Sequence, residues 1–523
     1  MREDILETKI EKLKNIREFG MEAYPEKCER SMTNIEALEQ FDGLSAEGKE
    51  ITLLGRVKSN RPMGGSTFSH IEDGTGKIQI FLNKNNIEPA RNATPARNDA
   101  ATSGEHSVAG GETKYKLFAK NIEIGDFIQV SGKLFKTRQD EKTLEVHDWK
   151  VLSKNIRPIP TEYFGLKDEE ALLRKRYLDL MMNEETRELF RKKNIFWQTV
   201  RQFLVAENFL EVQTPVLEHT PGGADAEPFV THYNALDQDF YLRISLELPL
   251  KRLLVGGYER VFEIGRVFRN EGMDRDHLQE FDHMEFYSAY WDFQKGMEFC
   301  EKMFKEIVRN VETGLSVETG FKPVSTDVNQ LMITEYENNK IDWSKPFPVV
   351  DYFTEFKKET GLDLNADLSA EALRAKADEL KIKYEPNYSK GRMIDTIYKK
   401  TIRQKLIQPC FLVGHPLEVS PLAKIDLANP KKALRFQIVA GGSELCNAFS
   451  ELNDPIDQKN RFAQQMVARE GGDKEAQMMD EDFVEALEYG MPPAFGFGMS
   501  ERLFSFLMNK SIRETVIFPS VRK

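Results

Sequence analysis

The chain has 523 residues, of which 40% are hydrophobic and 30% are charged, and its formal net charge is −12. This length exceeds what one hydrophobic core usually serves, so we expect at least two domains, and the apolar content excludes a wholly disordered chain. The acidic balance excludes a general nucleic-acid binder, whose footprint is a strong basic excess, but it leaves a specific one open.

Neither a membrane anchor nor a disulfide framework is expected. The N-terminal run MREDILETKIEKLKNIREFG has a charged, helical pattern without the apolar core of a secretory signal, and no stretch reaches membrane-spanning length. The four cysteines lie far apart and form no CxxC pair, so neither disulfides nor a zinc site is indicated. We therefore expect a cytoplasmic protein.

Five short alternating runs follow the N-terminal helix and predict a small β-barrel of the OB type. They span residues 51–57, 66–74, 77–82, 126–137 and 143–152. The composition of residues 83–113 predicts a flexible insertion between the third and fourth strands. The two prolines of RPIPTEYFGLKDEE indicate a domain boundary, so we predict one domain over residues 1–157 and a second over residues 158–523.

The second domain is predicted to be a large α+β unit. Residues 186–209 carry apolar side chains at helical spacing and lead into the strand-like run FLEVQTPVL. Several strands are expected between Phe229 and Trp291, and a mostly helical region from about 295 to 405. Strands and then a helix return near the C-terminus.

The run VFEIGRVFRNEG places Glu263, Arg269 and Glu271 on one face of a predicted strand. An arginine fork can hold a phosphate with two hydrogen bonds, and a carboxylate nearby can accept from an adenine amino group. Glu285 and Tyr287 share a face of the next predicted strand, which would pair with the first as a hairpin. The alternatives are a solvated surface ion pair and, for Phe281, ordinary core packing rather than stacking on a base.

Two further segments could complete a nucleotide site. In GGSELCNAFSELND, alternation groups Asn447 with Phe449 and Glu451 but leaves Glu444 out of phase unless a bulge or bend intervenes. Such oxygen ligands suit magnesium that phosphates also hold, while a surface acidic strand is the alternative. In GFGMSERLF, two glycines allow the backbone to approach a ligand, and Arg502 in the first helical turn could reach a phosphate.

In chain order, these segments resemble the three signature motifs of the class II aminoacyl-tRNA synthetases. FLEVQTPVL with Pro215 is similar to motif 1, the FRNEG hairpin to motif 2 and GFGMSERLF to motif 3. An OB-like domain ahead of them narrows the resemblance to the subclass for Lys, Asp and Asn. The phrases TPGGADAEPFVTHYNALDQDFYLRI, LKRLLVGGYERVFEIGR, EVSPLAK and FSELNDPIDQ resemble the lysyl-tRNA synthetase family over nearly the whole chain.

The resemblance implies an α+β fold, with an OB-fold anticodon-binding domain before an antiparallel-sheet catalytic domain flanked by helices. It implies an enzyme that uses ATP and Mg2+ to convert L-lysine to lysyl-adenylate and then transfers lysine to the 3′ end of tRNA(Lys). It also implies a homodimer whose interface includes Pro215.

The resemblance also assigns roles to individual residues. The expected ATP-binding residues are Arg269, Glu271, His277, Phe281, Glu444 and Arg502, of which Arg269 and Arg502 are the catalytic ones and Glu444 holds magnesium. The expected lysine-binding residues are Gly223, Glu247, Glu285, Tyr287, Asn447, Phe449 and Glu451. Carboxylates suit this role, because a buried ammonium needs them to offset its desolvation. The expected anticodon-binding residues are Phe68, Gln79 and Glu141.

Three departures from the family pattern stand out. Gln437 occupies a position where the family usually has a second magnesium-binding glutamate, GFGMSER is one residue shorter than GxGxGxxR, and Asp225 and Glu227 make the GGADAEPF loop more acidic than usual. Three other functions are considered: an aspartyl or asparaginyl enzyme, a catalytically dead RNA-binding relative, and a truncated relative that modifies a protein. Glu285 and Glu451 disfavour an aspartyl or asparaginyl enzyme. The intact Arg269 and Arg502 disfavour a catalytically dead relative, and the predicted barrel disfavours the truncated relative.

Overall fold

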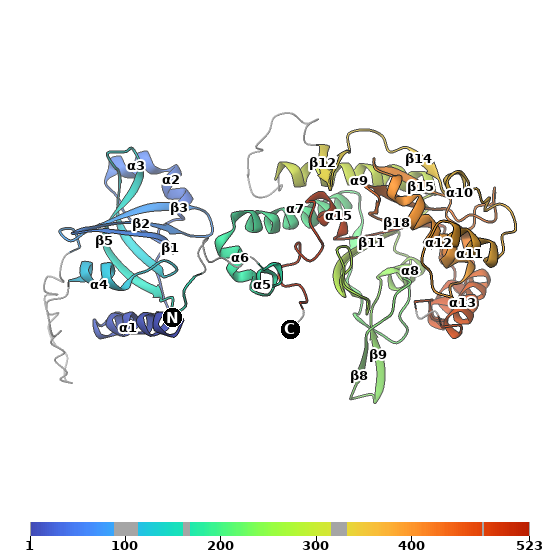
Figure 1. Ribbon diagram of the computed structural model, residues 1–523, viewed down its shortest axis with the longest axis horizontal. Coiled ribbons are helices and arrows are strands. Elements are labelled where there is room, and N and C mark those ends of the chain that lie inside the picture. Colours follow the sequence, from blue (N-terminus) through green and yellow to red (C-terminus); the bar gives the residue numbers. More distant parts are fainter. Residues whose placement is uncertain (1, 88–112, 160–167, 315–331, 473–474, 522–523) are drawn as a thin grey trace. The chain divides into compact units, whose positions relative to one another are not determined.

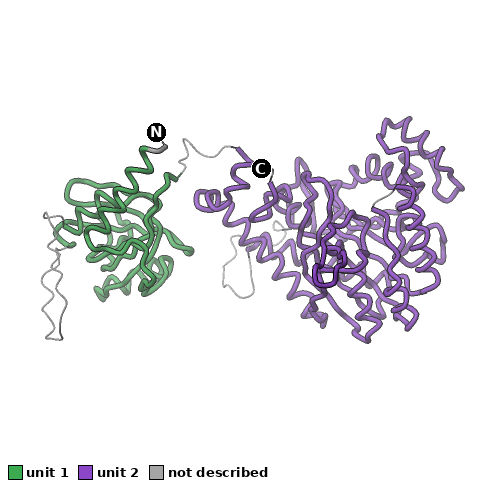
Figure 2. The backbone as a smooth tube through the Cα atoms, turned by 90° about the horizontal axis from the view of Figure 1, so that it is seen from below, with its two compact units in different colours: residues 1–166 green, residues 167–523 purple. Residues whose placement is uncertain are grey.

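The computed structural model describes residues 2–87, 113–159, 168–314, 332–472 and 475–521 (Figure 1). Its internal contacts divide the chain into two units, residues 1–166 and 167–523 (Figure 2). This division lies nine residues after the boundary that the sequence predicts, at residue 157. Most of the predicted insertion at 83–113 lies outside the described residues.

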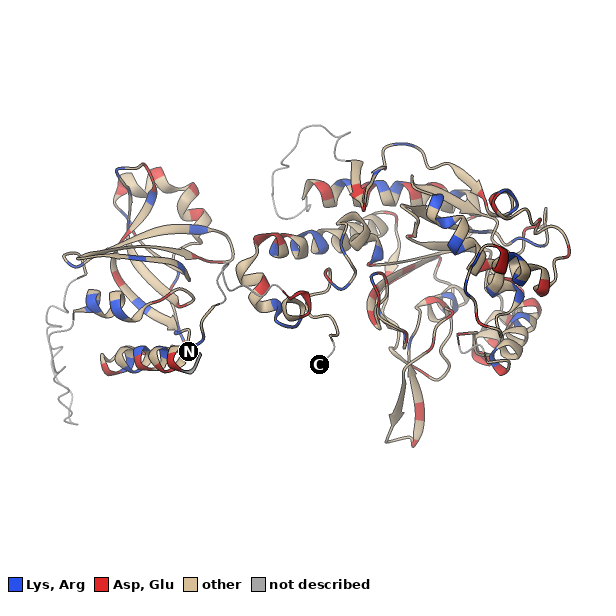
Figure 3. Cartoon of the chain, in the orientation of Figure 1, with Lys and Arg blue, Asp and Glu red and all other residues tan. Residues whose placement is uncertain are grey.

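The first unit is built around a closed five-stranded barrel, which confirms the predicted OB-type architecture. Its strands pair in the order β1-β2-β3-β5-β4, and the apolar sides of these strands fill the barrel with fully buried residues such as Leu53, Ile80 and Val130. The elements are α1 (Arg2–Glu18), α2 (Asn34–Glu39), α3 (Phe41–Glu47), β1 (Glu50–Met63), β2 (Ser66–Glu72), β3 (Lys77–Asn83), α4 (Lys114–Asn121), β4 (Phe127–Lys136) and β5 (Lys142–Ser153). Figure 3 shows acidic and basic residues interspersed along α1.

Strand β1 is longer than the sequence predicts. It pairs first with β4 and then, beyond a register shift between Val57 and Ser59, continues to Met63 along β2. The apolar alternation fades after Val57, so the second half of the strand carries no hydrophobic signal that would have marked it.

The second unit has a nine-stranded sheet. Eight of its strands follow the order β14-β15-β16-β18-β19-β11-β10-β6, and β17 pairs with β16. The pairs are antiparallel except β10 with β6 and β14 with β15. These strands are β6 (Leu210–Glu211), β10 (Arg260–Phe268), β11 (Glu280–Ala289), β14 (Val349–Asp351), β15 (Cys410–Val413), β16 (Arg435–Ala440), β17 (Ser443–Glu444), β18 (Asn447–Ser450) and β19 (Ala494–Ser500).

Helices and two small sheets surround this sheet. One small sheet pairs β12 with β13. In the other, β9 lies between β7 and β8, and the hairpin of β8 and β9 projects from the unit in Figure 1. The helices are α5 (Glu169–Arg174), α6 (Arg176–Met182), α7 (Glu184–Ala206), α8 (Glu247–Val255), α9 (Phe293–Thr313), α10 (Tyr352–Thr360), α11 (Ala370–Glu379), α12 (Lys390–Thr401), α13 (Pro455–Glu470), α14 (Glu481–Glu488) and α15 (Arg502–Leu507). The small strands are β7 (Leu217–Glu218), β8 (Val230–Tyr233), β9 (Gln238–Leu242), β12 (Ile333–Tyr336) and β13 (Asn339–Asp342).

The two faces of the large sheet differ in chemistry. On one face, Phe286 of β11 stacks on Phe497 of β19 with ring centroids 5.1 Å apart, and both belong to the core that α7 and α9 cover. Because successive strand residues point to opposite sides, their neighbours Glu285 and Tyr287 lie on the other face. One face of the sheet is therefore closed by apolar packing, and the other carries the polar side chains. No helix among the described residues is long and apolar enough to cross a bilayer.

Candidate active site

A cavity of about 280 Å³ opens on the polar face of the large sheet. Strands β11, β18 and β19 and the loops around them form its wall. Twelve of the residues that the sequence singles out line it together: Gly223, Glu247, Arg269, Glu271, His277, Phe281, Glu285, Tyr287, Glu444, Asn447, Phe449 and Arg502. All six positions expected for ATP and six of the seven expected for lysine thus share one cavity.

Glu285 is the centre of a buried hydrogen-bond network in this cavity. Its Oε1 accepts from the Ser245 hydroxyl at 2.5 Å and from the Leu246 backbone amide at 2.8 Å, and its Oε2 accepts from the Tyr287 hydroxyl at 2.7 Å. Burial alone would raise the pKa of Glu285, but donors including His283 and Ser245 hold it below its usual value. The site therefore keeps an ionised carboxylate in its floor.

Glu451 lies behind the wall rather than in it. The side chain is fully buried, and the Lys251 ammonium contacts its carboxylate and also lies 2.5 Å from Oε1 of Glu247. Burial raises the pKa of both Glu247 and Glu451, even though Lys251 lies between them. A third predicted residue of this region, Glu263, pairs with Arg243 and Thr214 instead and does not line the cavity.

Two glycines make room for this arrangement. A Cβ at Gly496 would lie 2.8 Å from Cδ1 of Tyr287 and closer still to Oε1 of Glu451. Gly223 has a φ of +85°, which side-chain-bearing residues rarely adopt, and a Cβ there would lie 2.8 Å from Cβ of Glu247. The glycines of GGADAEPF and GFGMSER thus allow the carboxylates and Tyr287 to approach the cavity closely.

Arg269 and Phe281 form another part of the wall. The Arg269 guanidinium lies over the Phe281 ring, 5.2 Å from its centroid, and Nε donates to the Ile244 carbonyl at 3.3 Å. Arg269 follows the end of β10, where its backbone amide still bonds to Gln279 across the hairpin. The hairpin therefore fixes a cation and an aromatic ring side by side.

The short motif GFGMSER still brings its arginine to the cavity. Strand β19 ends at Ser500, α15 begins at Arg502, and Nη2 of Arg502 donates to the Asp276 carbonyl at 3.1 Å. His277, in the same loop as Asp276, is half exposed and pairs with Asp274 at 2.8 Å. The missing residue does not prevent Arg502 from lining the site.

A break between two strands resolves the phase of Glu444. Glu444 ends β17 and Asn447 begins β18, so Leu445 and Cys446 interrupt the alternation. Both Glu444 and Asn447 consequently line the cavity. Oδ1 of Asn447 accepts from Arg435, which also donates to the Val419 carbonyl and so ties the EVSPLAK loop to the sheet.

The residues present fit a magnesium ion that phosphates help to hold. No group of three or more His, Cys, Asp or Glu side chains in the described ranges could hold a metal alone. Glu444 offers one carboxylate in the wall, and Mg2+ in nucleotide sites commonly uses only one or two together with substrate oxygens. Gln437 is buried at 4% exposure and lies outside the residues that line the cavity.

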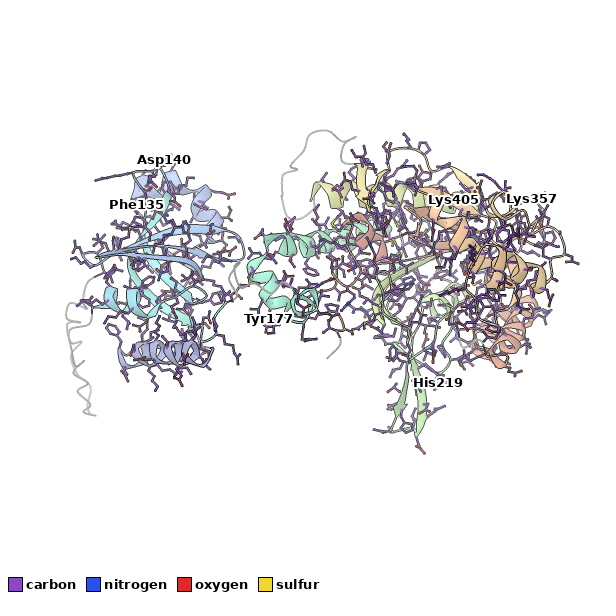
Figure 4. The ribbon with its side chains drawn as sticks, viewed as in Figure 1. Phe135, Asp140, Tyr177, His219, Lys357 and Lys405 are labelled. Carbon is purple, nitrogen blue, oxygen red and sulfur yellow. The ribbon has the colours of Figure 1, made fainter. Side chains whose placement is uncertain are left out.

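Of the three barrel residues, Glu141 is exposed, Phe68 is half-buried and Gln79 is buried at 8% exposure. Nε2 of Gln79 donates to Glu141 at 2.7 Å, and Glu141 sits in the turn between β4 and β5. Phe68 is half-buried, and its ring centroid lies 4.7 Å from that of Phe81, which lies 6.0 Å from Phe135 (labelled in Figure 4). Phe68 therefore belongs to a partly exposed aromatic row across β2, β3 and β4, and not to the barrel core.

Pro215 lies in a second depression of the second unit, about 540 Å³ in volume. The residue is exposed, as are the adjacent Val216 at 39% and Leu217 at 45%, and His219 (labelled in Figure 4) also lines the depression. An exposed apolar run of this kind is typical of a protein interface.

Among the polar residues that sequence reasoning missed, four bond to predicted site residues or lie within 4 Å of them: Ser245, Lys251, His283 and Arg435. Strand alternation could have found His283, which is in phase with Glu285 and Tyr287. The i, i+4 spacing of Glu247 and Lys251 in a predominantly apolar helix could have found Lys251. Ser245 and Arg435 carried no local signal.

Comparisons with known proteins agree with this geometry. A family described as tRNA synthetases class II (D, K and N) matches residues 168–522, and a family described as OB-fold nucleic acid binding domain matches residues 51–152. A lysine--tRNA ligase of Pelotomaculum thermopropionicum is 40% identical over 99% of this chain and 95% of its own length. The ligases of Halalkalibacterium halodurans, at 40% identity, and Moorella thermoacetica, at 39%, are covered over 97% and 98% of their lengths.

Proposed function

The chain belongs to the lysine--tRNA ligases of the class II tRNA synthetases, and from this premise we propose that it activates L-lysine with ATP and transfers it to tRNA(Lys). The observation that carries the proposal is the single cavity that Arg269 and Arg502 line together with the buried carboxylates Glu247 and Glu285. Such a cavity suits the binding of phosphates and ammonium groups together.

The first step joins the lysine carboxylate to the α-phosphorus of ATP. A carboxylate oxygen forms the new P–O bond, the bond to the bridging oxygen breaks, and pyrophosphate leaves. No side chain need act as a nucleophile, so the enzyme contributes positioning and charge stabilisation. Arg269 stabilises charge at the α-phosphate, while Arg502 and His277 hold the outer phosphates.

The adenine and the metal complete the ATP end. Phe281 stacks on the base, and Glu271 accepts from its amino group. Glu444 would hold Mg2+, which when bound supplies positive charge at the phosphate oxygens. Gln437, a buried neutral amide, adds no second carboxylate, so we propose that one protein carboxylate serves the metal.

The part of the cavity that binds the amino acid has carboxylates for two ammonium groups. Gly223 and Glu247 hold the backbone end and the α-ammonium, while Glu285, Tyr287 and Glu451 surround the side-chain ammonium beside Asn447 and Phe449. An aspartate substrate would need cations where this cavity has carboxylates, which disfavours the aspartyl and asparaginyl alternatives.

The barrel binds the tRNA anticodon, and the motif 1 segment forms the subunit interface. We propose that Phe68 stacks on an anticodon base while Gln79 and Glu141 contact base edges. The exposed apolar run at Pro215 would form a homodimer interface. The reaction takes place in the cytoplasm, where translation consumes its product.

Amino-acid-dependent exchange of pyrophosphate into ATP tests the proposed function. The assay is run with each of the twenty amino acids at saturating ATP and Mg2+. We expect lysine alone to stimulate the exchange. Stimulation by aspartate or asparagine, or by no amino acid, would reject the proposal.

Replacement of Arg269 tests its role at the α-phosphate. Loss of one preorganised group at a developing charge lowers turnover by about 100- to 1,000-fold, and we expect at least that decrease in exchange for Arg269→Ala. Arg266→Ala is the matched control, because Arg266 lies three residues earlier, in β10, but pairs with Asp282 outside the cavity. The control should keep near-normal exchange, and both variants should unfold at the wild-type temperature.

A further inference from the structure

Lys251 is a fully buried cation at the back of the lysine site. It lies one helical turn after Glu247 in α8, and its ammonium meets Glu247 on one side and Glu451 on the other. The rings of Phe449, Phe483 and Tyr287 enclose it, with centroids 5.3, 5.8 and 6.0 Å from Nζ. The ammonium does not line the cavity, so it acts on a ligand only through the carboxylates it touches.

The charges around Lys251 do not cancel. Three buried carboxylates, Glu247, Glu285 and Glu451, cluster around one buried ammonium, so the cluster carries two more negative than positive charges when all three are ionised. Three other basic side chains line the cavity: Arg435 donates to Asn447 and the 419–420 loop, Arg269 lies over the Phe281 ring, and Nε2 of His283 lies 3.3 Å from Glu285. Buried carboxylates without counter-ions are costly.

One oxygen also lacks a partner. Oε1 of Glu451 is fully buried, lies over Gly496 in the cavity wall, and has no hydrogen-bond donor in the described part of the chain. A purely structural ion pair would satisfy its own oxygens, because an unpartnered buried acceptor destabilises the fold. This oxygen therefore points to a donor that arrives with the ligand.

We propose that Lys251 is a positioning and specificity residue that sets the charge of the pocket to minus two, so that it matches the two ammonium groups of free lysine. This inference rests on the proposed function. Lys251 connects Glu247, at the α-ammonium end, with Glu451, at the side-chain end, and keeps both carboxylates aimed at the substrate. An amino acid with a neutral side chain has only its α-ammonium group, so its binding would leave one buried carboxylate unpaired.

A double-mutant cycle tests the charge match. Lysine affinity is measured by calorimetry at pH 8 for the wild type, Lys251→Met, Glu451→Gln and the double variant. The singles change the pocket charge to minus three and minus one, and the double variant restores minus two. We expect each single variant to bind lysine at least tenfold more weakly and the double variant to bind at least threefold more tightly than either single.

Controls separate this role from folding and from the proposed function. ATP affinity should stay at the wild-type value in all variants, and Arg252→Met, which breaks an ion pair with Asp480 on the same helix, should leave lysine affinity unchanged. If Lys251→Met does not fold, the lysine affinities of Glu451→Gln and the double variant are sufficient to test the charge match.

The inference is overturned if the double variant binds lysine no better than Glu451→Gln while ATP binding is normal. Failure of the wild type itself to bind lysine would instead overturn the proposed function. The two failures are therefore distinct.

Discussion

At the scale of single residues, Gly496 shows how a missing side chain shapes the site. Tyr287 and Glu451 occupy the space that a Cβ at position 496 would need. We expect Gly496→Ala to raise the KM for lysine at least tenfold, because both groups must move from the pocket, with little change in the KM for ATP. Pyrophosphate exchange at varied lysine and ATP measures both constants.

Gly498→Ala is the matched control for this prediction. Gly498 lies in the same strand, but a Cβ there would lie 3.1 Å from Nε2 of His283 and 3.4 Å from Cγ of Glu285, which small adjustments can relieve. Its effect on the KM for lysine should be clearly smaller. Equal effects of the two substitutions would mean that crowding at Tyr287 and Glu451 is not the cause.

At the scale of elements, strands β2, β3 and β4 together present the aromatic row of Phe68, Phe81 and Phe135. Stacking of a base on an aromatic side chain is worth about 1–3 kcal/mol. We expect Phe68→Ala and Phe81→Ala each to raise the KM for tRNA(Lys) by roughly tenfold or more, without a change in pyrophosphate exchange. Aminoacylation assays at varied tRNA measure this effect.

Phe127→Ala provides the comparison for the barrel. Phe127 is also partly exposed and lies in β4, but it packs under Arg56, outside the aromatic row. Its replacement should leave the KM for tRNA near the wild-type value. A similar loss in all three variants would indicate general damage to the barrel instead of a base-stacking surface.

At the scale of the whole molecule, each unit has its own hydrophobic core. The barrel residues form one cluster, while the clusters around Phe286, Leu250 and Tyr352 belong to the second unit. We expect residues 167–523 alone to exchange pyrophosphate with a near-normal KM for lysine, but to charge tRNA(Lys) at least tenfold less efficiently. Charging by this fragment at the full rate would contradict an RNA-binding role for the barrel.

The sequence by itself determined the family and the barrel, and it predicted many of the residues that line the large cavity. Period-two alternation located the barrel strands and the hairpin that carries Glu285 and Tyr287, because one-sided burial leaves a local pattern. The glycines of GFGMSER and GGADAEPF likewise indicated close approach of the backbone to a ligand. The order of these motifs along the chain was sufficient for the resemblance.

Only the tertiary structure decided how the charges pair. The strand break that brings Glu444 into the cavity, the location of Glu451 behind the wall and the ammonium of Lys251 between two carboxylates all depend on contacts between distant segments. Glu451 lies 200 residues from Lys251 in sequence and touches it in space. Hydrophobic periodicity reports which side of an element is buried, but not which residue of another element meets it there, so these contacts appear only when the sheet and α8 are assembled.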